Sequence, residues 1–398
     1  MTHDSRLDRR RRGRARGRGY LAIFGTLVLA LALAACGSSS SSSSSAAGGT
    51  SATNAAGSSG GSSSTSTAAA NLQQYTATPT KILNTTPLKS APPSGKTIVF
   101  LGTNNPSNVL VQQGTQKLAN LAHWNYSEVS YDPANPGTFN AALSSALAKH
   151  PQYLIEAGLP VTASQIAQAK NAGAKWILDS VYPAQVGGPV LTVVDSYAQD
   201  AVMGKIIADY FVSDSGGKGN AVIEHVPAYP ILNGFTDGFT KEVQAQCPGC
   251  KMSTTNITIP DLVAGKTPST LVSALRSNPS ANYLVFDDGP FADGITSALA
   301  GAGLNGKVKV IGEASDVAGV AALKNGTESA WTGFDPAYQG YLNLDTAFRD
   351  AEGMPIPQDQ EGLMPTQLLT KSTIGSTTNW SAPTDAQAQF LKLWHLQG

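Results

Sequence analysis

Short apolar runs alternate with segments of helical period over most of the chain from Lys96 to Ser372. Such strand–helix alternation predicts βαβ units around parallel sheets. About 280 residues exceed the usual size of one hydrophobic core, so two lobes are expected. The ten runs that predict strands are Thr97–Leu101, Glu128–Tyr131, Tyr153–Glu156, Lys175–Asp179, Val190–Val194, Ala221–Glu224, Met252–Ile257, Tyr283–Phe286, Val308–Ile311 and Ser329–Thr332.

The first 36 residues follow a different pattern, in which eight arginines precede an apolar run from Tyr20 to Ala35. A basic region, a short apolar region and a small-residue cleavage site predict a secretory signal peptide over residues 1–35. The run is shorter than the ~20 apolar residues of a comfortable spanning helix. An uncleaved membrane anchor is the alternative, and a twin-arginine export signal fits the residues after the arginines poorly.

The end of this run, Leu33-Ala34-Ala35-Cys36-Gly37, resembles the bacterial lipobox. The resemblance implies that the Cys36 thiol receives a diacylglyceryl group and becomes the N-terminus of the mature chain. Two or more acyl chains hold a protein firmly on a bilayer. We therefore expect a chain that is lipid-anchored to the outer face of the cytoplasmic membrane.

Removal of the signal peptide changes the charge. The 27 basic residues lose eight arginines and the 27 acidic residues lose Asp4 and Asp8, which leaves 19 against 25 and a net charge of about −6. A mildly acidic body lacks the electrostatic footprint of a nucleic-acid-binding protein. Residues 36–93 consist largely of Ser, Ala, Gly and Thr and predict a disordered tether after the lipidated cysteine.

Besides Cys36 the chain has only Cys247 and Cys250. A C-x-x-C pair can be a redox centre, half of a zinc site or a small disulfide. Here it follows a predicted helix and precedes a strand, whereas a redox pair sits at a helix N-terminus, and an oxidising exterior favours a disulfide. The five histidines show no ligand spacing, so no metal is expected.

No motif in the sequence proposes an enzyme or a cofactor. The segment Gly301–Gly306 matches G-x-G-x-x-G by letter, but a helix precedes it and a strand follows it. A dinucleotide fingerprint needs the reverse order, so this segment is a helix end and turn.

From Lys96 onward the chain resembles the type I periplasmic binding proteins of the ribose/galactose group. The resemblance covers about 275 residues and rests on weak motifs in the right order. The motifs are Lys96–Pro106 with its Asn-Asn-Pro loop, Asn171–Asp179, Asn233–Phe239, Val285–Asp288, Val310–Glu313, and Trp331–Pro336 followed by Tyr338–Gly340.

The resemblance implies two doubly wound parallel-sheet lobes joined by three crossover strands, expected near Asp195, Ala314 and Asp335. The first lobe should comprise residues 96–195 plus 335–353, and the second 196–334 plus 364–372, with a C-terminal tail over 373–398. In open α/β sheets ligands bind beyond the carboxyl ends of the strands. Two such sheets facing each other would form a cleft that closes about a hinge.

The expected positions of polar residues at the strand ends of this fold predict which residues bind the ligand. Carboxylates and amides suit vicinal hydroxyls, and an aromatic face covers the apolar side of a sugar ring. Ordinary helix capping and turn formation are the alternative for the Asn and Asp residues. The candidates are Asn104, Asn105, Asp179, Asn233, Asp288, Glu313, Phe334 and Asp335.

Several positions depart from the family pattern. A basic residue commonly follows the first-lobe Asp and an Arg often opens the second-lobe helix, but here these positions are Ser180 and Asn233. Ser107-Asn108 replaces a pair of aromatic residues, Glu313-Ala314 replaces an aromatic residue and Asp, and Phe334 replaces Gln. A sugar, a polyol, an amino sugar or a polyamine-like cation would all suit a site with carboxylates and no Arg.

We expect a monomeric, non-enzymatic protein that binds a small polar solute and delivers it to an ABC permease in the membrane. A component that presents its ligand to a membrane receptor or kinase is the alternative. An extracytoplasmic enzyme on the same scaffold is a third possibility. A DNA-binding regulator is excluded, because a signal and a Ser-rich tether replace the N-terminal helix-turn-helix it would need.

Overall fold

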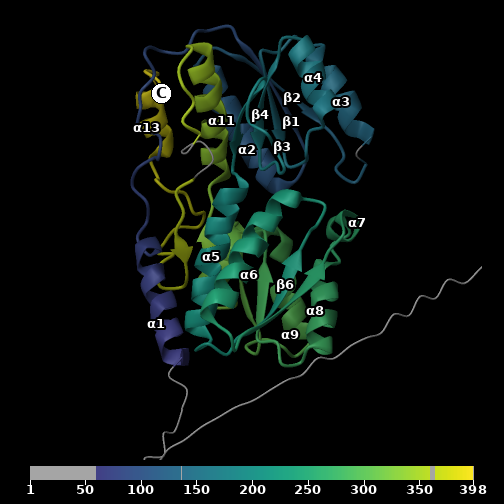
Figure 1. Ribbon diagram of the computed structural model, residues 1–398, viewed down its shortest axis with the longest axis vertical. Helices are drawn as coiled ribbons and strands as arrows, with labels where there is room; N and C mark the ends of the chain where they lie inside the picture. The colour runs from purple at the N-terminus through teal and green to yellow at the C-terminus, as the bar shows by residue number, and fades with distance from the viewer. Residues whose placement is uncertain (1–59, 136, 359–363, 398) are drawn as a thin grey trace, which may run out of the picture. The chain divides into compact units, whose positions relative to one another are not determined.

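The computed structural model describes residues 60–135, 137–358 and 364–397. The predicted signal peptide and Cys36 lie outside the described residues. Two parallel sheets form the centre of the described chain, each covered by helices on both faces (Figure 1). The predicted fold class, two doubly wound α/β lobes, is confirmed.

The first sheet has the strand order β2-β1-β3-β4-β5, and every neighbouring pair is parallel. Its inner strands β1, β3 and β4 are nearly continuous apolar runs because helices bury both faces. In β1, Ile98 and Phe100 face one core and Val99 and Leu101 face the other. The strand bounds are β1 Thr97–Gly102, β2 Asn125–Ser130, β3 Tyr153–Ala157, β4 Lys175–Asp179 and β5 Val190–Val194.

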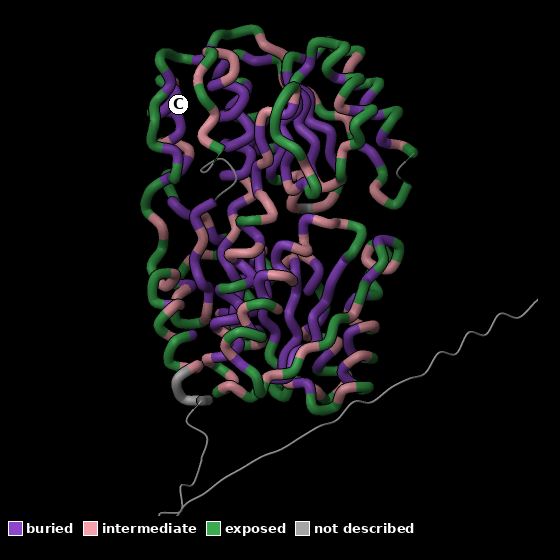
Figure 2. Tube along the Cα trace, viewed as in Figure 1, coloured by how far each residue is buried: buried purple, intermediate pink, exposed green. Residues whose placement is uncertain are grey.

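Helices from both ends of the chain cover the first sheet. One face carries α3 (Gly137–Leu147) and α4 (Ala163–Asn171), and the other carries α2 (Pro106–Leu121), α11 (Pro336–Ala351) and α13 (Ala386–Leu393). The inner strands β1, β3 and β4 are buried, whereas the edge strand β2 and the outer faces of the helices are more exposed (Figure 2). The C-terminal tail therefore contributes a helix to the first lobe.

The second sheet has the order β11-β10-β9-β8-β6-β7, with only β11 antiparallel among these strands. One face is covered by α5 (Tyr197–Asp214) and α6 (Asn233–Gln246), and the other by helices between β7 and β10. Those helices are α7 Ile259–Val263, α8 Thr267–Ser277, α9 Ile295–Gly301 and α10 Val317–Asn325. The strand bounds are β6 Asn220–His225, β7 Lys251–Asn256, β8 Tyr283–Phe286, β9 Lys309–Ser315, β10 Ala330–Gly333 and β11 Leu368–Leu369.

Two glycines allow α5 and α6 to pack closely. A Cβ atom on Gly204 would lie 2.2 Å from the carbonyl oxygen of Phe235, and one on Gly238 would lie 2.3 Å from that of Ala201. Any larger residue at either position would force the helices apart. This packing fixes α5, which begins directly after a crossing between the lobes and supplies one wall of the site described below.

The chain passes between the lobes at the predicted crossovers near Asp195 and Asp335, which follow β5 and β10. The expectation of a crossover near Ala314 is wrong, because Ala314 lies within β9 of the second sheet. The third crossover that the family resemblance implies lies instead between α11 of the first lobe and β11 of the second. Two further crossings join β11 to α13 and α1 to the first lobe.

The N-terminal segment corrects a second expectation, since residues 60–93 of the predicted disordered tether are folded. Helix α1 (Gly60–Leu72) buries Ala68 and Leu72 against the second-lobe helices α5 and α6. Residues 76–90, which we call the N-terminal strap, then run along the first lobe and bury Ile82 and Leu88 in its core. Burial of a few apolar side chains spaced along this polar segment is enough to keep it packed against both lobes.

The strap is fixed by hydrogen bonds to the C-terminal part of the chain. The Leu88 amide donates to the Leu393 carbonyl at 3.0 Å, and the Leu83 amide donates to the Tyr338 hydroxyl at 3.1 Å. These two partners follow the strap residues by 305 and 255 positions in sequence, so the segment's own composition gives no sign of them. Just after the strap, the Trp124 indole donates to the Pro93 carbonyl at 2.8 Å.

Cys247 and Cys250 form a disulfide with a Cα–Cα distance of 5.3 Å, at the turn between α6 and β7. Within the described ranges no helix is both long and apolar enough to cross a membrane. No cluster of three or more His, Cys, Asp or Glu side chains in the same ranges could hold a metal ion.

Candidate functional site

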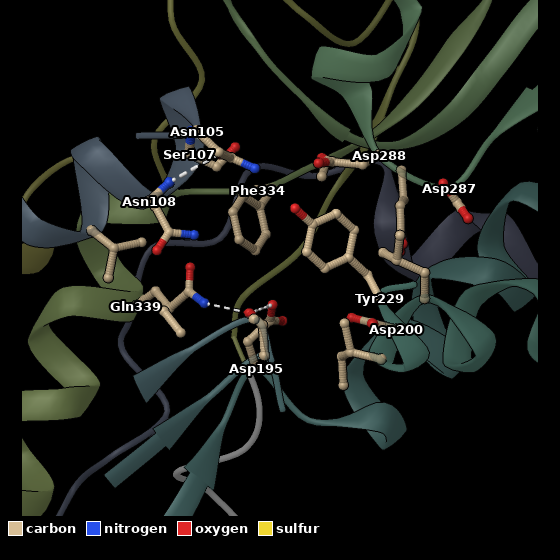
Figure 3. A pocket seen from close by; sticks show the side chains of 18 of the residues that line it. Asn105, Ser107, Asn108, Asp195, Asp200, Tyr229, Asp287, Asp288, Phe334 and Gln339 are labelled. Atoms are coloured by element: carbon tan, nitrogen blue, oxygen red, sulfur yellow. Dashed lines mark hydrogen bonds between the residues drawn. The ribbon is translucent and has the colours of Figure 1, made fainter. Parts of the chain in front are cut away.

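A cavity with an empty volume of about 770 Å³ lies at the carboxyl ends of both sheets. Ends of strands from each lobe contribute to its wall, as expected for open parallel sheets. The lining residues include polar groups from the first lobe, carboxylates from the crossing and the second lobe, and aromatic rings (Figure 3).

The first-lobe wall begins directly after β1. The Asn105 carboxamide oxygen accepts from the backbone amides of Ser107 and Asn108, at 2.8 and 3.3 Å, and so caps α2. Its amide group remains available to the cavity (Figure 3). One side chain thus both starts the helix and lines the site.

The same wall includes Gln339 from the first turn of α11. Its amide donates to the Ser180 hydroxyl at 2.9 Å and also bonds to Asp179. Strand register also brings Ser180 next to Asp195, because Asp179 at the end of β4 pairs with Val194 at the end of β5. Accordingly the Ser180 hydroxyl donates to Asp195 Oδ2 at 2.8 Å.

Five carboxyl groups line the cavity, and four of them come from the second lobe. Asp195 follows β5 at the crossing, and Asp200 lies in the first turn of α5. Asp287 and Asp288 follow β8, and Glu313 lies near the end of β9. Phe286 pairs with Gly312, so the register places Asp287 and Glu313 on adjacent strands.

Burial and mutual repulsion favour the neutral forms of four of these carboxyl groups. Burial raises the pKa of Asp195 to about 6, against the opposing hydrogen bond from Ser180. Burial also raises the pKa values of Asp200, Asp288 and Glu313 well above their usual range, and the charges of neighbouring carboxylates add to the effect. These carboxyl groups therefore favour binding of a solute that carries a positive charge or hydrogen-bond donors.

Aromatic side chains cover part of the cavity. Tyr229 follows β6, Phe291 follows β8, and Phe334 follows β10 at the crossing into α11. Figure 3 shows the Tyr229 and Phe334 rings between the amide-bearing wall and the carboxylates. Flat apolar faces next to polar groups suit a solute that is polar at its edges.

Three lining residues adopt left-handed backbone conformations. Ser180, Asp195 and Ala314 have φ angles of 52°, 49° and 56°. Such φ angles are costly for residues with a Cβ atom, and they concentrate at functional sites. Each of the three lies at or next to the end of a strand, where the backbone turns away from the sheet toward the cavity.

The structure brings four of the eight predicted site residues into the cavity wall: Asn105, Asp288, Glu313 and Phe334. Asn104 is exposed and lines a wider opening next to the cavity, with an empty volume of about 1630 Å³. The two spaces share Thr103, Asn105, Tyr229 and Phe291. Asn104 therefore lies at the mouth of the cleft.

The other three predicted residues do not line the cavity, because neighbouring groups engage their side chains. Asp179 is fully buried and accepts from Gln339 and Asn343, so it positions Gln339 from behind. The Asn233 amide donates to the Pro230 carbonyl at 2.9 Å. Asp335 caps α11, as the alternative assignment for these residues anticipated, and accepts from the Ser381 hydroxyl at 2.6 Å.

Sequence reasoning missed Asp195, Asp200, Tyr229, Asn108 and Gln339, all of which line the cavity. Asp195 ends an apolar strand just as Asp179 does, so the same signal could have found it. Gln339 lies inside a motif that carried the family resemblance. Asp200 and Tyr229 sit in a helix turn and a loop where the sequence gives no comparable signal.

The family model of the periplasmic binding protein domain matches residues 97–354 of the sequence. The chain belongs to the periplasmic binding protein family. It is accordingly a solute-binding protein and not an enzyme. No curated protein matches the sequence.

Solved structures share the fold of this periplasmic binding protein at low sequence identity. An ABC transporter solute-binding protein from Agrobacterium vitis, bound with α-D-tagatopyranose, matches with a TM-score of 0.62 and 20% identity over 71% of this chain and 97% of its own. One from Actinobacillus succinogenes with D-allose has a TM-score of 0.61 and 17% identity, over 71% and 100%. A 5-methylthioribose transporter protein from Thermotoga lettingae has a TM-score of 0.64 and 17% identity, over 77% and 96%.

Proposed function

We propose that this periplasmic binding protein captures one small polar solute, a sugar or a sugar-like molecule, and delivers it to an ABC importer. The main support for this proposal is that both lobes contribute polar side chains to one cavity at the carboxyl ends of their sheets. The sugars named for the solved structures of the same fold, tagatopyranose and allose, support a solute of this size and polarity.

Capture would proceed by closure of the lobes on the solute. Asn105 and Gln339 approach it from the first lobe, and Asp288 and Glu313 from the second. Only the closed state lets one solute contact both sets, and this difference in contacts is what drives closure. The crossings between the lobes would bend while each separately packed sheet stays intact.

The location follows from the N-terminal sequence. A signal peptide over residues 1–35 and a lipidated Cys36 would place the protein on the outer face of the cytoplasmic membrane, beside a permease. Residues 37–59 would then separate the lipid from α1. The folded part would stay close to the importer while remaining free to exchange solute with the medium.

Isothermal titration with sugars and polyols, on wild type and Asp288→Ala, tests the proposal. Loss of a buried acceptor leaves solute donors unpaired, which costs ~1–3 kcal/mol and weakens binding by about tenfold or more. Asp261→Ala is the control, because the Asp261 side chain is 40% exposed on α7 and lies outside the cavity lining. If Asp288→Ala binds as tightly as wild type and the control, the cavity is not the capture site.

A further inference from the structure

The two walls of the cavity differ in their chemistry. The first lobe contributes hydroxyl and amide groups, whereas the second lobe contributes four of the five carboxyl groups and Asp195 follows β5 at the crossing (Figure 3). No Lys, Arg or His occurs among the described residues that line the cavity. The first-lobe groups are Thr103, Asn105, Ser107, Asn108, Ser180 and Gln339.

Several of the carboxylate oxygens lack a partner. Glu313 Oε2, Asp287 Oδ1 and Asp195 Oδ1 accept no hydrogen bond from any described part of the protein. The Glu313 and Asp287 side chains are 2% and 0% exposed, so bulk water does not solvate them freely. A buried carboxylate without donors is costly, and the site is therefore complete only when something else supplies them.

The surroundings of the cavity offer little compensation for this charge. His225 Nδ1 lies 2.7 Å from Asp287 Oδ2, behind the cavity wall. Glu224 on the same strand as His225 is also buried, and burial together with the neighbouring Asp287 raises its pKa well above the usual range. Asp316, which caps α10, contributes to raising the pKa of Asp288 in the same way. The protein itself thus gathers acidic groups on one side of the cavity, and a cation bound there would favour their ionised forms.

We propose that the captured solute is a hydroxylated amine carrying a positive charge at neutral pH. This inference rests on the proposed function and specifies its substrate class. The ammonium group lies against the carboxylates of the second lobe, near Glu313 and Asp288. The hydroxyl groups face the amides of Asn105 and Gln339 in the first lobe.

The aromatic rings fit the same solute. Tyr229 and Phe334 lie beside the carboxylates, and a cation is attracted to the face of an aromatic ring. A neutral sugar could donate hydroxyl groups to some of the carboxylates but would leave their charge uncompensated. An ammonium group both donates hydrogen bonds to the carboxylate oxygens and reduces the repulsion between the carboxylates.

Matched solutes that differ in one group test the charge directly. D-Glucamine and D-sorbitol differ by an ammonium in place of a hydroxyl, as do D-glucosamine and D-glucose, and putrescine and butane-1,4-diol differ at both ends. Titration calorimetry at about pH 7 should show at least one cation binding about tenfold or more tightly than its neutral twin. Titration at raised salt should reduce this preference only modestly, because the site is buried.

Two variants locate the effect. Glu313→Gln keeps the shape of the side chain and removes its charge, so the preference for the cation should fall by about fivefold or more. Glu328→Gln is the matched control, because Glu328 is also a buried second-lobe carboxyl but lies outside the cavity lining and bonds to the Trp331 indole at 2.7 Å. The control should keep the wild-type preference.

The outcomes separate this inference from the proposed function. If neither hydroxylated amine binds more tightly than its neutral twin, the inference is overturned while solute capture stands. An equal loss of preference in Glu313→Gln and Glu328→Gln also overturns it, since the effect would then be structural. Binding of neither member of any pair at millimolar concentration counts against both.

Discussion

The side-chain amide of Asn84 donates a 2.7 Å hydrogen bond to Asp345 Oδ2, and both side chains are buried. Arg349 Nε lies 2.6 Å from the same carboxylate, and the Trp394 indole donates to its other oxygen at 2.6 Å. Arg349 also donates to the Thr86 carbonyl at 2.7 Å. One buried cluster therefore joins the N-terminal strap, α11 and the C-terminal tail.

Asn84→Ala should destabilise the protein by removing one donor from this cluster. Asp345 Oδ2 keeps its bond to Arg349, so the variant loses one hydrogen bond to a charged group, which costs ~1.5–3 kcal/mol of the free energy of unfolding. Urea denaturation measures it. Thr85→Ala is the control, because Thr85 is exposed beside it on the strap and should change stability by less than about 0.5 kcal/mol. Equal stability of the two variants would show that the strap is not held by this bond.

The strap should also limit how far the lobes separate. Gln367, next to β11, donates to the Thr76 carbonyl, and Gln389 in α13 donates to the Thr80 carbonyl, both at 3.0 Å. The four residue-to-residue steps from Thr76 to Thr80 can span at most about 14 Å at ~3.5 Å per step. An insertion of about ten Gly/Ser residues after Thr78 should therefore increase the radius of gyration of the solute-free protein in small-angle scattering.

The same insertion after Asn305 serves as the control, because that turn lies within the second lobe between α9 and β9. It lengthens the chain equally without touching a connection between the lobes. A larger radius of gyration in the Thr78 insertion alone supports the restraint. Equal radii in the two variants would mean that the strap does not limit opening.

Much of the fold could be predicted from the sequence because its signals are local. All ten apolar runs that predicted strands are strands, and their order along the chain determined the βαβ pattern. The strap could not be predicted, because its stability depends on partners such as Asp345 and Leu393 that follow 250 to 310 residues later. Ser- and Thr-rich composition indicates low intrinsic order, but it cannot reveal a surface that receives the segment.

The site was predicted only in part, for a related reason. Strand ends pointed to Asp288 and Glu313, which line the cavity, since the carboxyl ends of parallel strands meet at one edge. The direction of a side chain at such an end depends on its neighbours. Asp179 turns into the interior to meet Asn343, while Asp195, at the end of the adjacent strand, lines the cavity.

The pH dependence of stability should reflect Asp195. Burial raises its pKa from 3.8 to about 6, so the folded state favours the protonated form. The stabilisation is present below about pH 4 and is lost as the pH rises through about 6. Asp195→Asn keeps an acceptor for the Ser180 hydroxyl and should raise the thermal midpoint of the solute-free protein at pH 7, by a free energy of at most about 3 kcal/mol, with little change at pH 4. A midpoint unchanged at both pH values would contradict the placement of this group.

The membrane anchor depends on one thiol. Cys36→Ala should remove the diacylglyceryl mass from the protein and release it from membranes into the soluble fraction, since the acyl chains supply the attachment. Intact-mass spectrometry and fractionation of the expressing cells measure the two effects. Cys247→Ala with Cys250→Ala is the control that removes the other cysteines and should leave lipidation unchanged. A Cys36→Ala protein that still carries lipid would contradict the proposed location.

The central claim is that one solute is held by groups of both lobes and closes them around it. Small-angle scattering of the wild-type protein, with and without the tightest-binding solute of the matched pairs, tests this most directly. We predict that the radius of gyration falls when the solute is added, and that Asp288→Ala at the same solute concentration shows a smaller fall, because the second lobe then lacks a contact that favours closure. Saturating solute that leaves the radius of gyration of the wild type unchanged would contradict capture by closure.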